Sequence, residues 1–179
     1  MSRYKLVSGL IMVFLLFLGG CYDSPFPLGA AEQGHVDDRL VNGWLEQPTK
    51  AADKPYHVIF HKFNEREYLV GFDNENGSES VLARAFITPI DGLTILNLQG
   101  IDTLEAKDRT FLFFKYEFTP DGNLRVWIFD GESPLLKDKT FANQAEFAKY
   151  INKNINDVTL YGTVREFRPV DDIRLVVTP

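Results

Sequence analysis

Apolar and polar residues alternate with a period of two along much of this chain, and this pattern limits its fold more than any other feature. The segment from Thr110 to Phe118 is the clearest case, because Lys115 and Glu117 separate its apolar positions. The apolar positions of one face are Leu112, Phe114, Tyr116 and Phe118. A period of two places successive side chains on opposite faces of a β-strand. The pattern therefore predicts a mainly β protein.

The same alternation, with β-branched and aromatic runs, predicts seven strands and an eighth near the C-terminus. Their ranges are 40–45, 56–63, 67–72, 80–88, 93–98, 110–118, 124–129 and 158–167. The links are short and contain turn residues, above all Asn76-Gly77, whose residue types tolerate the positive φ values of a tight hairpin. Short links join antiparallel neighbours most economically. We therefore expect a single antiparallel meander.

One segment changes to helical spacing. Apolar residues recur at intervals of three and four along one stripe, at Phe141, Ala145, Ala148 and Ile151. Asn143 followed by Glu146 offers a capping box at its start, and Thr140 is an alternative cap. The sequence thus predicts one α-helix over about 141–154, before the last strand.

The arrangement over residues 36–168 resembles the lipocalin or calycin architecture. In that group a Gly-x-Trp motif near the first strand closes one end of a barrel, with the Trp packed beneath it. Here Gly43 and Trp44 are adjacent, and the helix precedes the eighth strand instead of following it. The resemblance implies a small barrel of about eight strands; a strongly curved sheet is the alternative. Closure is also favoured because a meander leaves two unpaired edges that invite aggregation.

The N-terminus carries a different signal. Arg3 and Lys5 precede an apolar run from Leu6 to Leu18. This run is shorter than the ~20 apolar residues that a membrane-spanning helix needs. A short apolar run after a basic start is typical of a secretory signal peptide. We therefore expect residues 1–20 to be a cleaved leader.

The end of that run, Leu18-Gly19-Gly20-Cys21, resembles the lipobox of bacterial lipoproteins and contains the chain's single cysteine. The resemblance implies that Leu18, Gly19 and Gly20 are read by the signal peptidase and that Cys21 receives a diacylglyceryl group. Its new amine would then be acylated, with palmitate for example. Two or more acyl chains anchor a protein stably to a membrane. The alternatives are an ordinary signal peptide that leaves Cys21 as a free thiol, and an uncleaved anchor helix.

The lipobox resemblance also implies a location in the cell envelope. In enteric-type lipoproteins an Asp after the lipidated Cys retains the protein in the inner membrane, and here Tyr22 stands at that position. An outer-membrane protein facing the periplasm is therefore expected if the organism has two membranes. Residues 21–34 are rich in Pro and Gly and predict the lipidated Cys with a flexible tether. The barrel domain would follow over 35–168, and a C-terminal tail over 169–179.

Composition limits the partners. The net charge is −6, and removal of the basic leader makes the chain more acidic. An acidic chain without a dense basic run argues against nucleic acid and against an anionic lipid surface as partners, because both favour clustered Lys and Arg. A single Cys excludes internal disulfides, paired redox thiols and multi-thiolate zinc sites.

No motif predicts a reaction. His57 and His61 lie four residues apart on a predicted strand, about 13 Å at ~3.3 Å per residue, too far for one metal ion. Asp73 to Glu79 lacks the glycine spacing of a calcium loop. Asp37-Asp38 and Asp171-Asp172 are expected to be solvated charge. We therefore predict no catalytic residue, no metal site, no cofactor and a non-enzymatic protein, although an enzyme using a few carboxylates in the barrel mouth stays open.

Aromatic residues are the remaining candidates. They line a ligand cavity or simply form core, and they are Trp44, Phe111, Phe113, Trp127 and Phe129. The first functional hypothesis is a membrane-anchored envelope protein that binds a small apolar ligand or has a structural role. The second is a protein-interaction module, an envelope assembly factor or inhibitor, that acts through the outer surface of the barrel and exposes an apolar patch.

Overall fold

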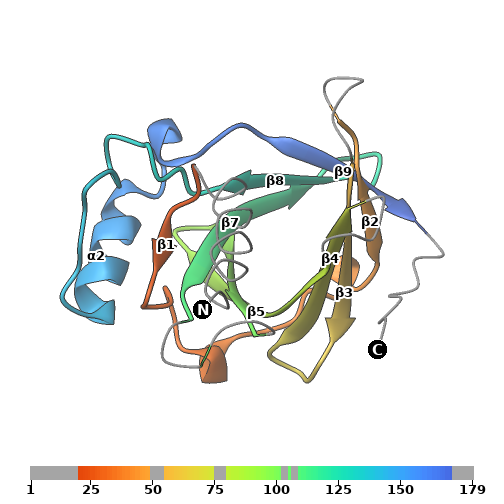
Figure 1. Cartoon of the computed structure of the whole chain (residues 1–179), viewed down its shortest axis with the longest axis horizontal. Coiled ribbons are helices and arrows are strands. Elements are labelled where there is room, and N and C mark those ends of the chain that lie inside the picture. Colours follow the sequence, from red (N-terminus) through yellow and green to blue (C-terminus); the bar gives the residue numbers. More distant parts are fainter. Residues whose placement is uncertain (1–19, 49–54, 75–79, 102–104, 106–108, 171–179) are drawn as a thin grey trace, which may run out of the picture.

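The chain folds into a closed antiparallel barrel of eight strands, shown in Figure 1. The structure is a computed structural model, and it describes residues 20–48, 55–74, 80–101, 105 and 109–170. The barrel strands are β2 (Gly43–Glu46), β3 (Tyr56–Lys62), β4 (Tyr68–Asn74), β5 (Ser80–Ile90), β6 (Leu93–Gly100), β7 (Phe111–Phe118), β8 (Leu124–Ile128) and β9 (Arg165–Val170). The predicted meander of about eight strands is confirmed.

Two pairings close the sheet. Consecutive strands pair from β2 to β8, and β9 inserts between β8 and β2. Trp44 on β2 lies opposite Pro169, and Leu124 on β8 lies opposite Phe167, so β9 is paired along both sides. Closure removes the unpaired edges that a flat meander would expose. The barrel, and not the open curved sheet, is therefore the correct alternative.

The described residues contain one α-helix, α2 (Gln144–Asn154), which lies between β8 and β9, as predicted. Asn143 is its N-cap, and its side chain accepts a hydrogen bond from the Glu146 N–H at 3.0 Å. The Glu146 carboxylate reaches back to the N–H of Ala142, one residue before the cap, at 3.0 Å. The helix thus begins at Gln144 and not at 141, because Asn143 satisfies its first free donor.

Two predicted strand boundaries were wrong, each because a short 3-10 turn replaces strand. Residues 38–40 form the turn η2 (Asp38–Leu40), so the first barrel strand begins at Gly43. Residues 158–160 form the turn η4 (Val158–Leu160), and the last strand runs to Val170. Residues 169 and 170, assigned to a tail, therefore belong to the barrel. The rest of that segment and the predicted Asn76-Gly77 turn lie outside the described residues.

The barrel interior forms one hydrophobic core, the inner core. It is filled by side chains that register places on the inward face of every strand. Its buried members are Leu40, Trp44, Val58, Phe60, Tyr68, Val70, Ala83, Ala85, Ile87, Leu96, Leu98, Tyr116, Leu124 and Phe167.

A second core, the outer core, lies against the outside of β6 and β7. In Figure 1, α2 stands outside the barrel, and β1 (Asp23–Ser24) lies between α2 and β7. The buried members come from the N-terminal segment, from β6 and β7, and from the connection between β8 and β9: Leu28, Ile95, Phe113, Phe129, Leu136, Phe147, Ile151, Ile155 and Leu160. The strands β6 and β7 are therefore buried on both faces.

The N-terminal segment differs from the flexible tether expected over 21–34. Residues 21–34, here called the strap, run along the outside of the barrel. Ser24 pairs with Phe111 as part of β1, and the Leu28 N–H donates to the buried Asn97 side chain at 2.8 Å. Gly29 approaches Thr88 so closely that a Cβ would lie 2.6 Å from its Oγ1. Tyr22, Phe26 and Leu28 of the strap pack in the outer core, and this packing holds the segment in place.

Candidate functional site

One end of the barrel is closed by η2 and Trp44. The Trp44 indole is 2 % exposed and donates from Nε1 to the Leu40 carbonyl at 3.0 Å. Arg39 donates to both carboxylate oxygens of Asp37, at 2.9 and 2.6 Å, and its guanidinium lies 4.5 Å above the Phe118 ring centre. The sequence places a Trp at this position, and the structure puts it inside the closed end.

Two tyrosines join this closed end from within. The Asp37 N–H donates to the Tyr68 hydroxyl, and the Tyr116 hydroxyl donates to the Asp37 carboxylate at 3.3 Å. Burial raises the pKa of both tyrosines. Hydrogen bonds from Arg39 hold the pKa of Asp37 below its usual range. Asp37 was expected to be solvated charge; instead it links η2 to the barrel wall, while Asp38 is exposed.

The inner wall toward the other end, here called the open half, is less completely buried. Four inward-facing apolar side chains there pack against the inner core yet stay partly exposed: Phe72, Leu112, Phe114 and Val126. Register fixes their direction, because Phe114 lies opposite the buried Leu96, and Val126 lies opposite the buried Tyr116. The inward-facing apolar side chains of the open half are thus less completely buried than those of the inner core.

Charged side chains stand where β2 ends and β9 begins. The Glu46 carboxylate lies 3.5 Å from the Arg165 guanidinium, which is 5.7 Å from the Tyr56 ring centre. Arg165 is opposite Val126 in the sheet register. A polar rim beside an apolar wall suits a ligand with an apolar body.

Cys21 lies on the barrel wall and not at the far end of a tether. Its backbone forms a β-bridge with Asp130, and the N–H of Tyr22 donates to the Phe129 carbonyl at 2.9 Å. Burial raises the pKa of the Cys21 thiol, an effect that the nearby Arg165 charge opposes. Leu18 and Gly19 of the proposed lipobox lie outside the described residues.

Tyr22 has a packing role. Its ring lies 5.9 Å from that of Phe147 and 6.5 Å from that of Phe113, between α2 and β7. Burial raises its pKa to about 12. An aromatic residue after Cys21 therefore has a structural reason that is independent of membrane sorting, which stays a prediction.

The other aromatic candidates lie outside the barrel. Phe113 and Phe129 are completely buried in the outer core, where their ring centres are 5.4 Å apart. Phe111 packs on the edge of that core. Trp127 faces outward beside Lys115. Of the five predicted cavity or core aromatics, Trp44 alone lines the barrel interior.

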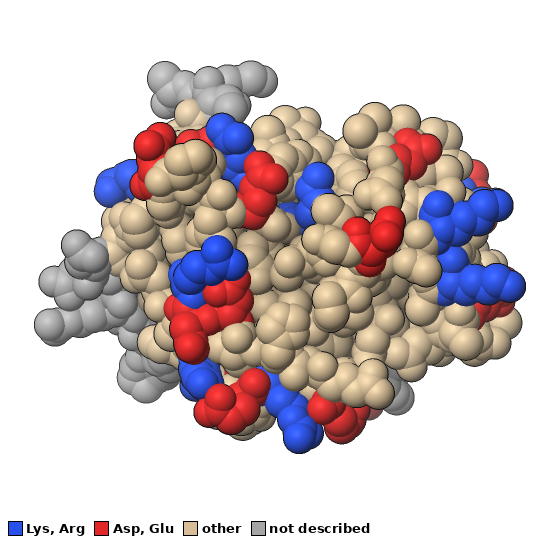
Figure 2. Space-filling model, turned by 180° about the vertical axis from the view of Figure 1, so that it is seen from behind, with Lys and Arg blue, Asp and Glu red and all other residues tan. Residues whose placement is uncertain are grey.

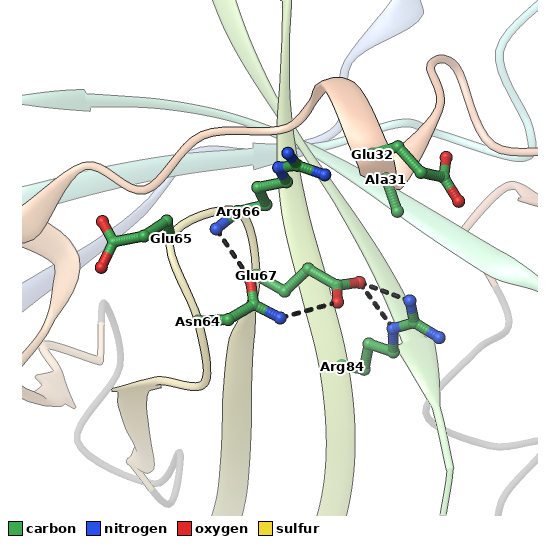
Figure 3. A pocket seen from close by; sticks show the side chains of 7 residues that line it. All are labelled: Ala31, Glu32, Asn64, Glu65, Arg66, Glu67 and Arg84. Atoms are coloured by element: carbon green, nitrogen blue, oxygen red, sulfur yellow. Dashed lines mark hydrogen bonds and ion pairs between the residues drawn. The ribbon is translucent and has the colours of Figure 1, made fainter.

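A charged cleft of about 340 Å³ lies where the strap passes the β3–β4 loop, and Figure 3 shows its lining. Arg84 Nε donates to Glu67 Oε1 at 2.7 Å, and Asn64 donates to the other carboxylate oxygen at 3.2 Å. The Glu32 and Glu65 side chains point away from this group (Figure 3). Glu67 is therefore neutralised within the protein, and the cluster ties β4 to β5.

Neither His57 nor His61 belongs to a metal-binding cluster of the described residues. His57 Nδ1 lies 3.1 Å from Asp73 Oδ1 across the β3–β4 pair, and His61 is exposed nearer the other end of β3. Within the described ranges, no three His, Cys, Asp or Glu side chains come close enough to hold an ion. Over the same part of the chain, no helix is long and apolar enough to cross a membrane.

Sequence reasoning missed Asn97 and Lys115. Asn97 is fully buried, and its side chain accepts a hydrogen bond from the strap. The sequence feature that could have identified it is a polar residue within the apolar run of β6. Lys115 was recognised as outward-facing, but its aromatic neighbours come from β8 and from beyond η4, so no local pattern revealed them.

Comparison of the chain with protein-family models, with curated proteins and with solved structures gave no match. The class of protein is therefore defined by the architecture: an eight-stranded, all-antiparallel meander barrel with a helix before its last strand.

Proposed function

We propose that this protein is a lipid-anchored, non-enzymatic component of the bacterial cell envelope that binds a small apolar ligand in the open half of its barrel. The observation that carries the ligand proposal is the inner wall described above. The barrel is closed at the η2 end, while Phe72, Leu112 and Phe114 keep accessible surface inside it. Eight-stranded barrels either fill their interior or hold one small ligand.

The lipid anchor is supported by sequence at Cys21 and is compatible with its position on the barrel. A diacylglyceryl group there would hold the barrel itself near the membrane, because the strap begins at the wall. An outer-membrane location facing the periplasm is the corresponding proposal for a cell with two membranes. Expression of the full chain and of its Cys21→Ser variant tests the lipid anchor. The full chain should fractionate with membranes and carry extra mass, and the variant should do neither.

Native mass spectrometry tests the ligand. Residues 20–179 with Cys21→Ser should show a native mass above the denatured mass, and the difference should disappear on denaturation. Binding of an environment-sensitive fluorescent fatty acid gives a second readout. Equal masses together with no probe binding would contradict the ligand proposal.

A matched pair of variants locates the ligand. Val126→Trp adds bulk to the open half, whereas Glu117→Trp adds the same side chain on the outward face of β7. Val126→Trp should abolish probe binding and Glu117→Trp should retain it, with circular dichroism confirming that both fold. Equal binding by both variants would show that the probe binds outside the barrel.

A second candidate function is the protein-interaction module. It is favoured by Phe63, which follows β3 and is 68 % exposed. Figure 2 shows acidic and basic side chains interspersed over one face of the molecule, with broad neutral areas between them. Crosslinking in cells should then recover a partner that Phe63→Ser loses. Absence of any crosslinked partner would count against this function.

A further inference from the structure

A groove of about 250 Å³ lies on the outside of the barrel, between the β7–β8 pair and the segment that follows α2. Its floor is Lys115, whose ammonium is 4.1 Å from the Trp127 ring centre and 4.6 Å from the Tyr161 ring centre. Its apolar lining includes Leu93, Ile155 and Val158. This groove, here called the lysine groove, is separate from the barrel interior.

The net acidic composition argues against broad attraction to an anionic surface, but the lysine groove is a single local site, and its chemistry suits an anionic amphiphile. Among the described residues, no ion pair with a carboxylate is present at Lys115, and its ammonium lies against the faces of two aromatic rings. The nearest acid by sequence on β7, Glu117, is turned toward Arg125. Asn156, which lines the groove, donates a hydrogen bond from its side chain to the Asp91 carboxylate at 2.6 Å.

Apolar surface is exposed beside this positive charge. Val158 on η4 is 82 % exposed, the most exposed large apolar side chain in the described part of the molecule. Tyr161 is held in place because its hydroxyl donates to the Ile155 carbonyl at 2.6 Å. Trp and Tyr rings with a nearby Lys are the residues that proteins place at a membrane surface, where an apolar stem and a polar end are both accommodated.

The lysine groove adjoins the proposed anchor. Asp130 connects them: its backbone pairs with Cys21, and its N–H donates to the Leu160 carbonyl at 3.0 Å. A Cβ at Gly162, which lines the groove, would lie 3.9 Å from the Asp130 Cβ. Figure 1 shows the start of β1 beside the chain that leads from α2 to β9. Acyl chains on Cys21 would therefore bring this groove to the same bilayer.

We propose that the lysine groove binds an anionic phospholipid of the membrane that anchors Cys21, with the lipid phosphate on Lys115 and an acyl chain along Val158 and Leu93. The proposal rests on the proposed lipid anchor for its orientation. The bound lipid would fix which side of the barrel faces the bilayer, because it adds a second contact point to the one at residue 21.

The experiment couples residues 20–179 to vesicles through Cys21, the chain's single thiol, with a maleimide-bearing lipid. Vesicles contain phosphatidylglycerol and phosphatidylcholine in one fixed ratio, and bromine is carried by one or the other lipid. Bromine quenches tryptophan on contact; Trp44 is buried inside the barrel, so quenching reports Trp127. Trp127→Phe should remove the quenched signal and verifies this assignment.

We expect each phosphatidylglycerol molecule to quench Trp127 about fivefold more strongly than each phosphatidylcholine molecule, the factor that one lysine contributes near an anionic surface. The excess should fall as salt is added. Lys115→Gln should abolish it. Lys139→Gln is the matched control, since Lys139 also lies over an aromatic ring, that of Tyr150, but outside the groove, and it should keep the excess.

Three results would overturn the proposal: no quenching by either lipid, equal quenching per molecule, or an excess that Lys115→Gln retains. Because the coupling is chemical, these outcomes do not depend on whether cells lipidate Cys21. Failure of the membrane-fractionation experiment with Cys21→Ser would instead remove the proposed anchor and leave the lipid preference of the groove as measured.

Discussion

The inner and outer cores share the strands β6 and β7 but are filled differently. The inner core includes two tyrosine hydroxyls bonded to Asp37, and six partly exposed apolar side chains pack against it, four of them in the open half. The outer core is dense and aromatic, and it joins Tyr22, Phe113, Phe147 and Tyr161 across most of the chain length. The wall formed by β6 and β7 is thus packed on both faces, and its outer face contributes a core of its own.

Two neighbouring residues of β7 give the strongest test of this difference. Phe113→Ala should lower the free energy of unfolding by about 3–5 kcal/mol, because its ring is fully buried in the outer core. Phe114→Ala should cost less than half as much, since its ring faces the open half and is partly exposed. Urea unfolding measures both. Equal losses would mean that the two cores are packed alike.

Asn97 tests how firmly the strap holds the outer core in place. Asn97→Ala leaves the buried Leu28 N–H without its acceptor and should cost about 1–3 kcal/mol. Limited proteolysis should then cut within 21–34 sooner than in the unmodified protein. Gln99→Ala, on the same outward face of β6, is the control. Unchanged cleavage in Asn97→Ala would show that the strap is held by other contacts.

Asp37 tests the inner core at its closed end. Its pKa is lowered in the folded state, so its contribution to stability is present above the unfolded pKa and is lost as pH falls through the folded value. Asp37→Asn should therefore cost about 1 kcal/mol at neutral pH and flatten the loss of stability below about pH 4. Urea unfolding of both proteins at a series of pH values from neutral to below pH 4 measures the loss of stability and its pH dependence. Asp38→Asn should keep the original slope.

The smallest effect is expected at the charged cleft, which belongs to neither core. Arg84→Gln removes the ion pair with Glu67, but the Arg84 side chain is 47 % exposed and the Asn64 hydrogen bond remains. A loss of about 1 kcal/mol or less is expected by thermal or urea unfolding. A loss as large as that of Phe113→Ala would show that this ion pair contributes as much to stability as the outer core does.

The sequence was sufficient for the strand count, the meander and the position of α2, because period-two runs and turn residues act locally. The strap was missed because its contacts are distant: Leu28 bonds to Asn97, and Tyr22 packs on Phe147. One signal was available. The run Phe111 to Phe114 is apolar on both faces, which is typical of a strand covered on both sides, and it called for a cover outside the barrel. Of the site, the sequence named Trp44 as a cavity or core residue, whereas the grouping of Lys115 with Trp127 depends on neighbours that only the three-dimensional structure brings together.

The insertion of β9 between β2 and β8 also determines when the molecule can fold. Gly43 pairs with Val170, so the first barrel strand receives its second partner only after residue 170 has been made. β1 likewise waits for Leu112, and the strap waits for α2. Contacts between such distant residues slow folding. Closure of the barrel is therefore a late event, because it requires residues 165–170 to pair with both β2 and β8.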